Sequence, residues 1–124
     1  MSNIIRIGNG QGFWGDSIDA PVKLAKDGPL DYLTLDYLAE VTLSIMQRQK
    51  LKNPNAGYAR DFLDLVERIL PEISDKGVKV ITNAGGVNPQ SYRSELIQLA
   101  KSSGKEIKIG VIKGDDIFPT LVEL

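Results

Sequence analysis

The segment from Arg6 to Ser17, RIGNGQGFWGDS, decides the fold that the sequence predicts. It follows the apolar residues Ile4 and Ile5 and contains four glycines, an adjacent Phe and Trp, and an Asp-Ser pair. A strand that runs into a glycine-rich turn and then a helix is typical of the first unit of a parallel α/β sheet. Glycine lets a ligand approach the backbone, and the N–H groups at the start of the next helix favour an anion. This loop is therefore the first candidate site.

The rest of the chain alternates between segments with strand and helix periodicity. Strands are expected at about residues 3–8, 31–36, 78–83 and 107–113, and helices at about 19–26, 37–51, 58–76 and 90–103, before a last short helical turn. Strands separated by helices predict parallel pairing with right-handed crossovers. The expected fold is α/β and doubly wound, a Rossmann-like, mostly parallel four-stranded sheet with helices on both faces. The apolar helix at 37–51 is expected to pack on the sheet.

Length and composition indicate one globular domain over residues 1–124. The formal net charge of −1 comes without a basic run, so nucleic acid is not an expected partner. No apolar stretch reaches the roughly 18 residues of a membrane span, and the start of the chain lacks a leader pattern, so a cytoplasmic location without membrane association is expected. The apolar end, FPTLVEL, stands where another strand and helix would usually follow, which suggests truncation.

The chain contains no Cys and no His. Disulfides, thiolate nucleophiles, imidazole bases and soft-metal ligands are therefore excluded for this sequence. Acid–base chemistry has to come from carboxylates, Lys, Tyr or hydroxyl groups, and a Ser nucleophile would need a Lys partner. No such pair is evident, and the sequence leaves open whether the chain is an enzyme.

The loops that follow the predicted strands are the candidate ligand-binding segments, since ligands of open α/β sheets bind beyond the carboxyl ends of the strands. These loops are rich in Gly, Asn and Asp, whereas the loops at the opposite edge are ordinary charged turns. An anionic small molecule held by backbone N–H groups is the expected ligand. The predicted ligand-binding residues are Gly8, Asn9, Gly10, Gly12, Trp14, Asp36, Asn83, Gly85 and Gly86.

Two aspartates, Asp16 and Asp116, are the candidate catalytic residues. Each has a structural alternative, because Asp16 could cap the helix after the first loop and Asp116 could cap the last helical turn. Together with Asp36 and Asp115 they could also supply hard oxygen ligands, so a divalent cation of the magnesium type is a candidate cofactor. The metal itself is left unknown.

A dinucleotide fingerprint is a further alternative, because Gly10, Gly12 and Gly15 have the G-x-G-x-x-G spacing and Asp36 follows about 20 residues later at a strand end. Against NAD(P) binding, Gly15 precedes Asp-Ser instead of lying inside a helix, and a bulky Phe-Trp pair occupies the turn. Glycines that merely turn the chain are another interpretation.

Two interpretations are open for Trp14, and two for Asn83. An aromatic side chain beside a strand end can belong to the core or contact a ligand. The Asn83 amide can bind a ligand or stabilise its own turn. The sequence does not decide between these alternatives.

Four segments of the chain resemble the acyclic terpene utilisation protein A family: IRIGNGQGFWGDS, DAPVKLAKDGPLDYLTLDYLAEVTLSIM, NAGGVNP and GDD, in this order. The resemblance covers essentially the whole chain, and the first two segments are long enough to be specific. Members of this family are longer, so the resemblance implies that the chain is an N-terminal portion. It also implies a role in the breakdown of acyclic terpenes or related organic acids, beside acyl-CoA carboxylases. It carries no defined reaction and no established catalytic residue.

Three functions follow as hypotheses. The first is a domain that binds a carboxylate or acyl-CoA metabolite at the glycine-rich strand ends. The second is a non-catalytic module that binds a protein partner or forms a homo-oligomer. The third is a domain of an NAD(P)-dependent enzyme.

Overall fold

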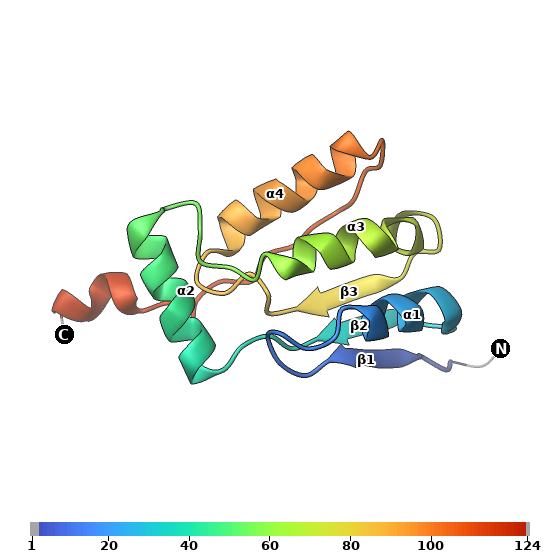
Figure 1. The fold of residues 1–124 in the computed structure, drawn as a ribbon, viewed down its shortest axis with the longest axis horizontal. Coiled ribbons are helices and arrows are strands. Elements are labelled where there is room, and N and C mark those ends of the chain that lie inside the picture. The colour runs from blue at the N-terminus through green and yellow to red at the C-terminus, as the bar shows by residue number, and fades with distance from the viewer. Residues whose placement is uncertain (1–2, 124) are drawn as a thin grey trace.

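The computed structural model describes residues 3–123, which form an α/β fold drawn in Figure 1. The elements follow the order β1 (Ile7–Gln11), α1 (Asp19–Asp27), β2 (Tyr32–Leu35), α2 (Glu40–Lys52), α3 (Asp61–Ser74), β3 (Lys79–Thr82), α4 (Pro89–Ser102) and the 3-10 helix η1 (Phe118–Glu123). Each predicted helix is confirmed within a few residues of its expected bounds. The first three predicted strands are confirmed as well, although β1 begins later than expected.

The sheet has three strands in the order β1-β2-β3, and both pairings are parallel. Tyr32 at the start of β2 is aligned with Ile7 on one side and with Lys79 on the other. The register shifts once, between Asn9 and Gln11 near the end of β1. Successive strands are therefore neighbours, and the chain builds the sheet in one direction only.

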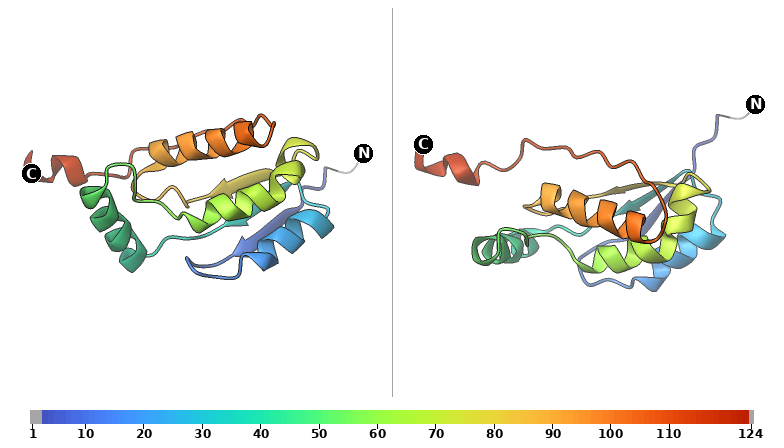
Figure 2. Two further views of the ribbon diagram at one scale, coloured as in Figure 1. Left: turned by 45° about the horizontal axis from the view of Figure 1, so that its top comes forward. Right: turned by 90° about the horizontal axis from the view of Figure 1, so that it is seen from above.

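The helices that cover the sheet lie on a single face, where α1, α3 and α4 stand side by side (Figures 1 and 2). Right-handed crossovers that advance in one direction place every crossover helix on the same face, and only a reversal of direction brings helices to the other face. No reversal occurs among the three strands. The expectation of a doubly wound sheet with helices on both faces is therefore wrong for the described part of the chain.

The fourth strand expected at 107–113 is not formed. Residues 105–117 are extended, and alternating side chains, among them Ile107 and Ile109, pack against the core, but the segment does not pair with β3. The carbonyl oxygen of Ile109 accepts a hydrogen bond from Nε of Arg93 at 3.1 Å. A β-branched sequence favours an extended conformation. To join a sheet, the segment also needs backbone groups that are free to pair with the next strand.

Helix α2 does not pack on the sheet, contrary to expectation. It lies beyond the strand ends in Figure 1, with Met46 as its only buried residue. Val41, Leu43 and Ile45 are exposed. Apolar side chains spread around a helix do not form the single stripe that a sheet surface would cover.

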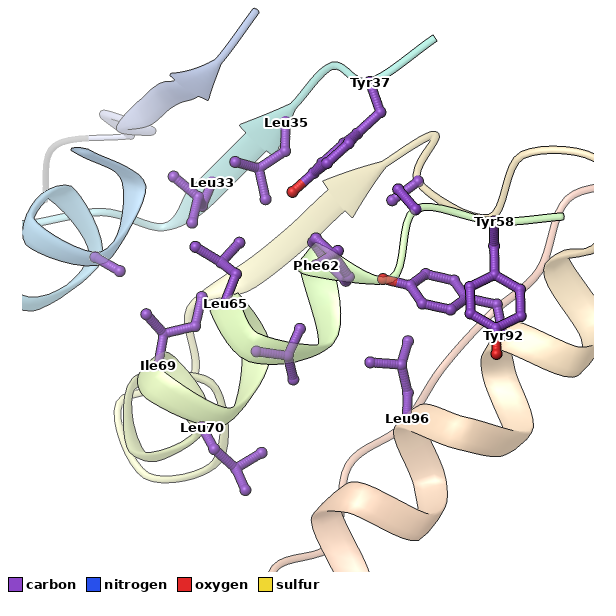
Figure 3. Packing of buried hydrophobic residues seen from close by; sticks show 14 of the residues in the cluster. Leu33, Leu35, Tyr37, Tyr58, Phe62, Leu65, Ile69, Leu70, Tyr92 and Leu96 are labelled. Carbon is purple, nitrogen blue, oxygen red and sulfur yellow. The ribbon is translucent and has the colours of Figure 1, made fainter. Parts of the chain in front are cut away.

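The core lies between the covered face of the sheet and helices α3 and α4 (Figure 3). Leu33 and Leu35 of β2 point toward α3, whose Leu65 and Ile69 are fully buried. At the carboxyl end of the sheet the core becomes aromatic. The ring of Phe62 lies 5.9 Å from that of Tyr37 and 5.6 Å from that of Tyr92, and Tyr92 stacks on Tyr58 at 4.8 Å.

The opposite face of the sheet is uncovered by the described residues. Ile7 of β1 is 65% exposed and Ile81 of β3 is 57% exposed. The ammonium group of Lys79 lies 5.2 Å from the centre of the Tyr32 ring on the neighbouring strand. Parallel sheets are normally buried on both faces, so an apolar open face is unusual.

Candidate functional site

The first two glycines of the loop segment serve packing between β1 and α1. A Cβ on Gly10 would lie 2.6 Å from Cβ of Pro21, and a Cβ on Gly8 would lie 2.9 Å from Leu24 Cδ2. At Gly10 a larger residue would push α1 away from the strand, whereas at Gly8 the ends of the Leu24 and Leu30 side chains would have to shift. Gly8 and Gly10 therefore face the helix, and their lack of a side chain has a structural cause.

The remainder of the glycine-rich loop is closed by Asp16. Its Oδ1 accepts a hydrogen bond from the Ser17 N–H at 2.7 Å, and its Oδ2 accepts one from the Gly12 N–H at 3.1 Å. A carboxylate therefore already occupies loop N–H groups that an external anion would use, and its charge would repel such an anion. Gly12 itself borders open space. The side chain of Asp16 thus organises this turn.

The ends of the three strands meet at a small cleft of about 340 Å³. Asn83, just after β3, donates from Nδ2 to Oδ1 of Asp36 at 2.8 Å and accepts at Oδ1 from the Tyr37 N–H at 2.7 Å. Asn9 of β1 lines the same cleft. Three predicted ligand-binding residues are thus brought together. The full lining is Asn9, Thr34, Leu35, Asp36, Ile81, Thr82 and Asn83.

The turn after Asn83 packs against the segment that links α2 to α3. Gly86 has a φ of +54°, and a Cβ there would collide with the Met46 sulfur and lie 2.6 Å from the Gly57 carbonyl oxygen. A Cβ on Gly85 would lie 3.0 Å from Cβ of Pro89 at the start of α4. Both glycines fit a crowded turn, so close packing accounts for them.

The hydrogen bond of the Asp116 side chain does not involve these strand-end residues. Its Oδ1 accepts a hydrogen bond from the Phe118 N–H at 3.1 Å, as the structural alternative of a cap for η1 predicts. Within residues 3–123, no group of three or more acidic side chains is placed to hold a metal ion. The carboxylates of Asp16, Asp36 and Asp116 therefore do not assemble the cation site that the sequence offered as a candidate.

Trp14 lies at a second, larger cleft of about 540 Å³. Its indole Nε1 donates a hydrogen bond to Oδ1 of Asp61 at 3.1 Å, which joins the loop after β1 to the first turn of α3. The half-buried indole packs against the core and also lines the cleft. The cleft is lined by Trp14, Gln49, Ala56, Gly57, Tyr58, Arg60 and Asp61.

Arg60 and Asp61 were not predicted from the sequence. The signal was present, because Gly57-Tyr58-Ala59-Arg60-Asp61 places an Arg-Asp pair where a loop becomes a helix. Arg60 is the one cation among the lining residues of the two clefts. Within the described chain, no residue accepts a hydrogen bond from the main-chain N–H of Arg60 or Asp61. The start of α3 therefore contributes Arg60 and Asp61 to the lining of the Trp14 cleft, and main-chain N–H groups at a helix start favour a negative charge nearby.

The tyrosines near this cleft are neutral at physiological pH. Burial raises the pKa of the Tyr58 hydroxyl, and Glu95 adds to this effect while Arg60 opposes it. Burial also raises the pKa values of Tyr37 and Tyr92, to which the negative charge of Asp61 contributes further. These phenols therefore stay protonated and do not act as bases at physiological pH.

These residues define the class of structure: a parallel α/β domain with two open clefts at the carboxyl edge of its sheet. The chain belongs to the acyclic terpene utilisation family, because the family model described as acyclic terpene utilisation family protein AtuA matches residues 5–124. The resemblance inferred from the sequence is thereby confirmed. Comparisons with curated proteins and with solved structures found no significant match. None of the helices in residues 3–123 is long and apolar enough to cross a membrane.

Proposed function

We propose that this chain is the metabolite-binding domain of a terpene utilisation protein, and that it binds an anionic small molecule, a carboxylate or an acyl-CoA, in the Trp14 cleft. One observation carries the proposal: Arg60, the one cationic residue among those that line the two clefts, stands at the start of α3, where the main-chain N–H groups of Arg60 and Asp61 have no acceptor among the described residues. Ligands of open α/β sheets bind at this edge. A guanidinium group matches the planar, two-oxygen geometry of a carboxylate.

The other two candidate positions suit an anion less well. The cleft between Asp36 and Asn83 contains a carboxylate and no cationic side chain. In the glycine-rich loop, the Gly12 and Ser17 N–H groups already bind the carboxylate of Asp16. The same contacts count against NAD(P), whose pyrophosphate would need these N–H groups. The Trp14 cleft is therefore the position that we propose.

Binding, and not catalysis, is the function that we assign to this chain. Asp16 and Asp116, the catalytic candidates, each accept hydrogen bonds from nearby main-chain N–H groups, and neither lines the Trp14 cleft. A role in the breakdown of terpenes or organic acids, which the family membership supports, and a cytoplasmic location are parts of this proposal.

The proposal is tested by titrating the protein with octanoate and with octanoyl-CoA while following the fluorescence of its single Trp. Binding should change the emission of Trp14, and Arg60→Gln should weaken it by about tenfold, because a charged hydrogen-bond partner is lost. The matched control is Arg48→Gln on the exposed surface of α2, which should leave binding unchanged. Equal affinity of the two variants, or no response to either ligand, would refute the proposal.

The open sheet face supports a second candidate function, that of an assembly module. Ile7 and Ile81 are exposed there, and a parallel sheet is normally covered on both faces. We propose a second copy of this chain as the covering partner. Sedimentation velocity should then show a dimer that dissociates in the Ile81→Lys variant. Ile112→Lys is the control, because Ile112 is 97% exposed in the extended segment outside the sheet. A monomer at all concentrations would rule out this assembly.

A further inference from the structure

From the lining of the Trp14 cleft we propose the chemical class of its ligand. The cleft takes a free carboxylate with one negative charge and an apolar chain of medium length, and it does not take the CoA thioester of the same acid. This inference rests on the proposed function, since it assumes that the cleft binds an anion. It narrows the proposed ligand to one of two forms of an organic acid, the free carboxylate and not the CoA thioester.

The charge of the cleft suits a single carboxylate. Arg60 is its one cationic side chain, and Asp61 beside it carries a negative charge that Trp14 holds through a hydrogen bond. Lys50, on the helix that contributes Gln49, directs its ammonium group to the carbonyl oxygen of Val87 at 2.8 Å. The lining therefore has no excess positive charge. One carboxylate can pair with Arg60, whereas the lining residues supply no second cation for the three phosphate groups of CoA.

The walls of the cleft suit an apolar chain. Trp14, Ala56, Gly57 and Tyr58 line it. Trp14 is half-buried, whereas Tyr58 is 3% exposed and stacks on Tyr92, so the indole is the main aromatic surface open to a ligand. Because the Tyr58 hydroxyl stays neutral, the ring presents no charge to a hydrocarbon chain. The volume of about 540 Å³ falls within the range of ordinary small-molecule sites. A chain of several methylene groups can therefore lie against the Trp14 side of the cleft while the carboxylate faces Arg60.

The affinity of a ligand series tests this assignment. Isothermal titration calorimetry on the intact chain would compare acetate, octanoate, octanoyl-CoA, CoA and octylamine. A fully buried methylene is expected to raise affinity about fourfold, so octanoate should bind at least tenfold more tightly than acetate. Octanoate should also bind at least tenfold more tightly than octanoyl-CoA. Octylamine, which has the same chain with the opposite charge, should not compete.

A variant of the cleft wall provides a test that leaves the core intact. Gln49 is exposed on α2 and lines the cleft, so Gln49→Glu adds a negative charge without disturbing buried packing. It should weaken octanoate binding by about three- to tenfold through like-charge repulsion. Gln98→Glu makes the same change on the exposed surface of α4 and should have no effect.

The outcomes separate this inference from the proposed function. If octanoyl-CoA binds more tightly than octanoate and Arg60→Gln weakens it, the proposed function stands and the free-acid assignment is wrong. If acetate and octanoate bind equally, the apolar walls have no role and the assignment is also wrong. If none of the anions binds, both the proposed function and the inference fail.

Discussion

Nε1 of Trp14 and Oδ1 of Asp61 form a hydrogen bond of 3.1 Å between the loop after β1 and the first turn of α3. The bond spans 47 positions of the sequence and joins the two sides of the larger cleft. Asp61 therefore has two effects on this cleft. Its carboxylate holds the Trp14 side chain, and its negative charge balances the positive charge of Arg60.

Asp61→Ala should loosen the Trp14 side chain. With its acceptor removed, the indole should become more exposed, and the emission of the single Trp should shift to longer wavelength. The free energy of unfolding should fall by about 1 kcal/mol, which is less than the loss expected for a fully buried hydrogen bond to a charged group. The control is Asp64→Ala, which removes another aspartate from the first turn of α3 and should leave the emission unchanged. An unchanged spectrum in the Asp61 variant would show that the bond does not hold the indole.

Gly10→Ala should destabilise the fold by about 1–3 kcal/mol, because its Cβ would meet Pro21 Cβ at 2.6 Å and force α1 away from β1. Chemical denaturation measures this difference. Gly12→Ala is the matched control in the same loop. No heavy atom lies within 4 Å of its added Cβ, so its stability should stay within about 0.5 kcal/mol of the original. Equal stability of the two variants would contradict the packing role of Gly10.

Tyr92→Phe should stabilise the protein. The Tyr92 hydroxyl is buried and has no hydrogen-bond partner among the described residues, so removing it should raise the free energy of unfolding by about 1 kcal/mol. The difference should grow above pH 10. The unfolded state ionises near its ordinary pKa of 10.0, whereas burial raises the pKa in the fold, so the native protein loses stability as the pH rises. A destabilising effect at pH 7 would mean that the hydroxyl has a favourable partner.

Asn83→Asp should destabilise the carboxyl edge of the sheet in a pH-dependent way. The change replaces the donor to Asp36 with a second carboxylate, while the oxygen that accepts from the Tyr37 N–H can remain. Repulsion between the two carboxylates should lower the free energy of unfolding more at neutral pH than in acid. The control, Asn55→Asp, alters an exposed residue whose side chain makes no hydrogen bond within the described chain. Parallel pH profiles for the two variants would contradict the account.

Local structure was largely predictable from the sequence, whereas the direction in which the sheet grows was not. Ile7, Leu33 and Val80 lie in strands because apolar, β-branched runs bounded by turns favour extended structure. Whether a crossover advances or reverses depends on which strand edge is free, and periodicity contains no information on that choice. Arg93 likewise binds the Ile109 carbonyl from a helix 16 residues away in the sequence, which strand propensity does not reveal.

The candidate site was predicted in part. The meeting of Asn9, Asp36 and Asn83 follows from parallel strands, whose carboxyl ends share one edge of the sheet. The contacts of Gly8 and Gly10 with α1 were not foreseen, because a glycine that permits packing and a glycine that permits ligand approach look the same in sequence. Arg60 does not follow a strand in the sequence, because it stands at the start of α3, which reaches this edge only in the folded chain.

The most direct test of the binding site is an isotope-filtered nuclear Overhauser measurement on the labelled chain with unlabelled octanoate. Octanoate bound in the Trp14 cleft should give cross-peaks between its chain protons and the ring protons of Trp14 and Tyr58. The amide signals of Arg60 and Asp61 should shift as well. Cross-peaks to residues of the Asp36 and Asn83 cleft alone, or none at saturating octanoate, would contradict the proposed binding site.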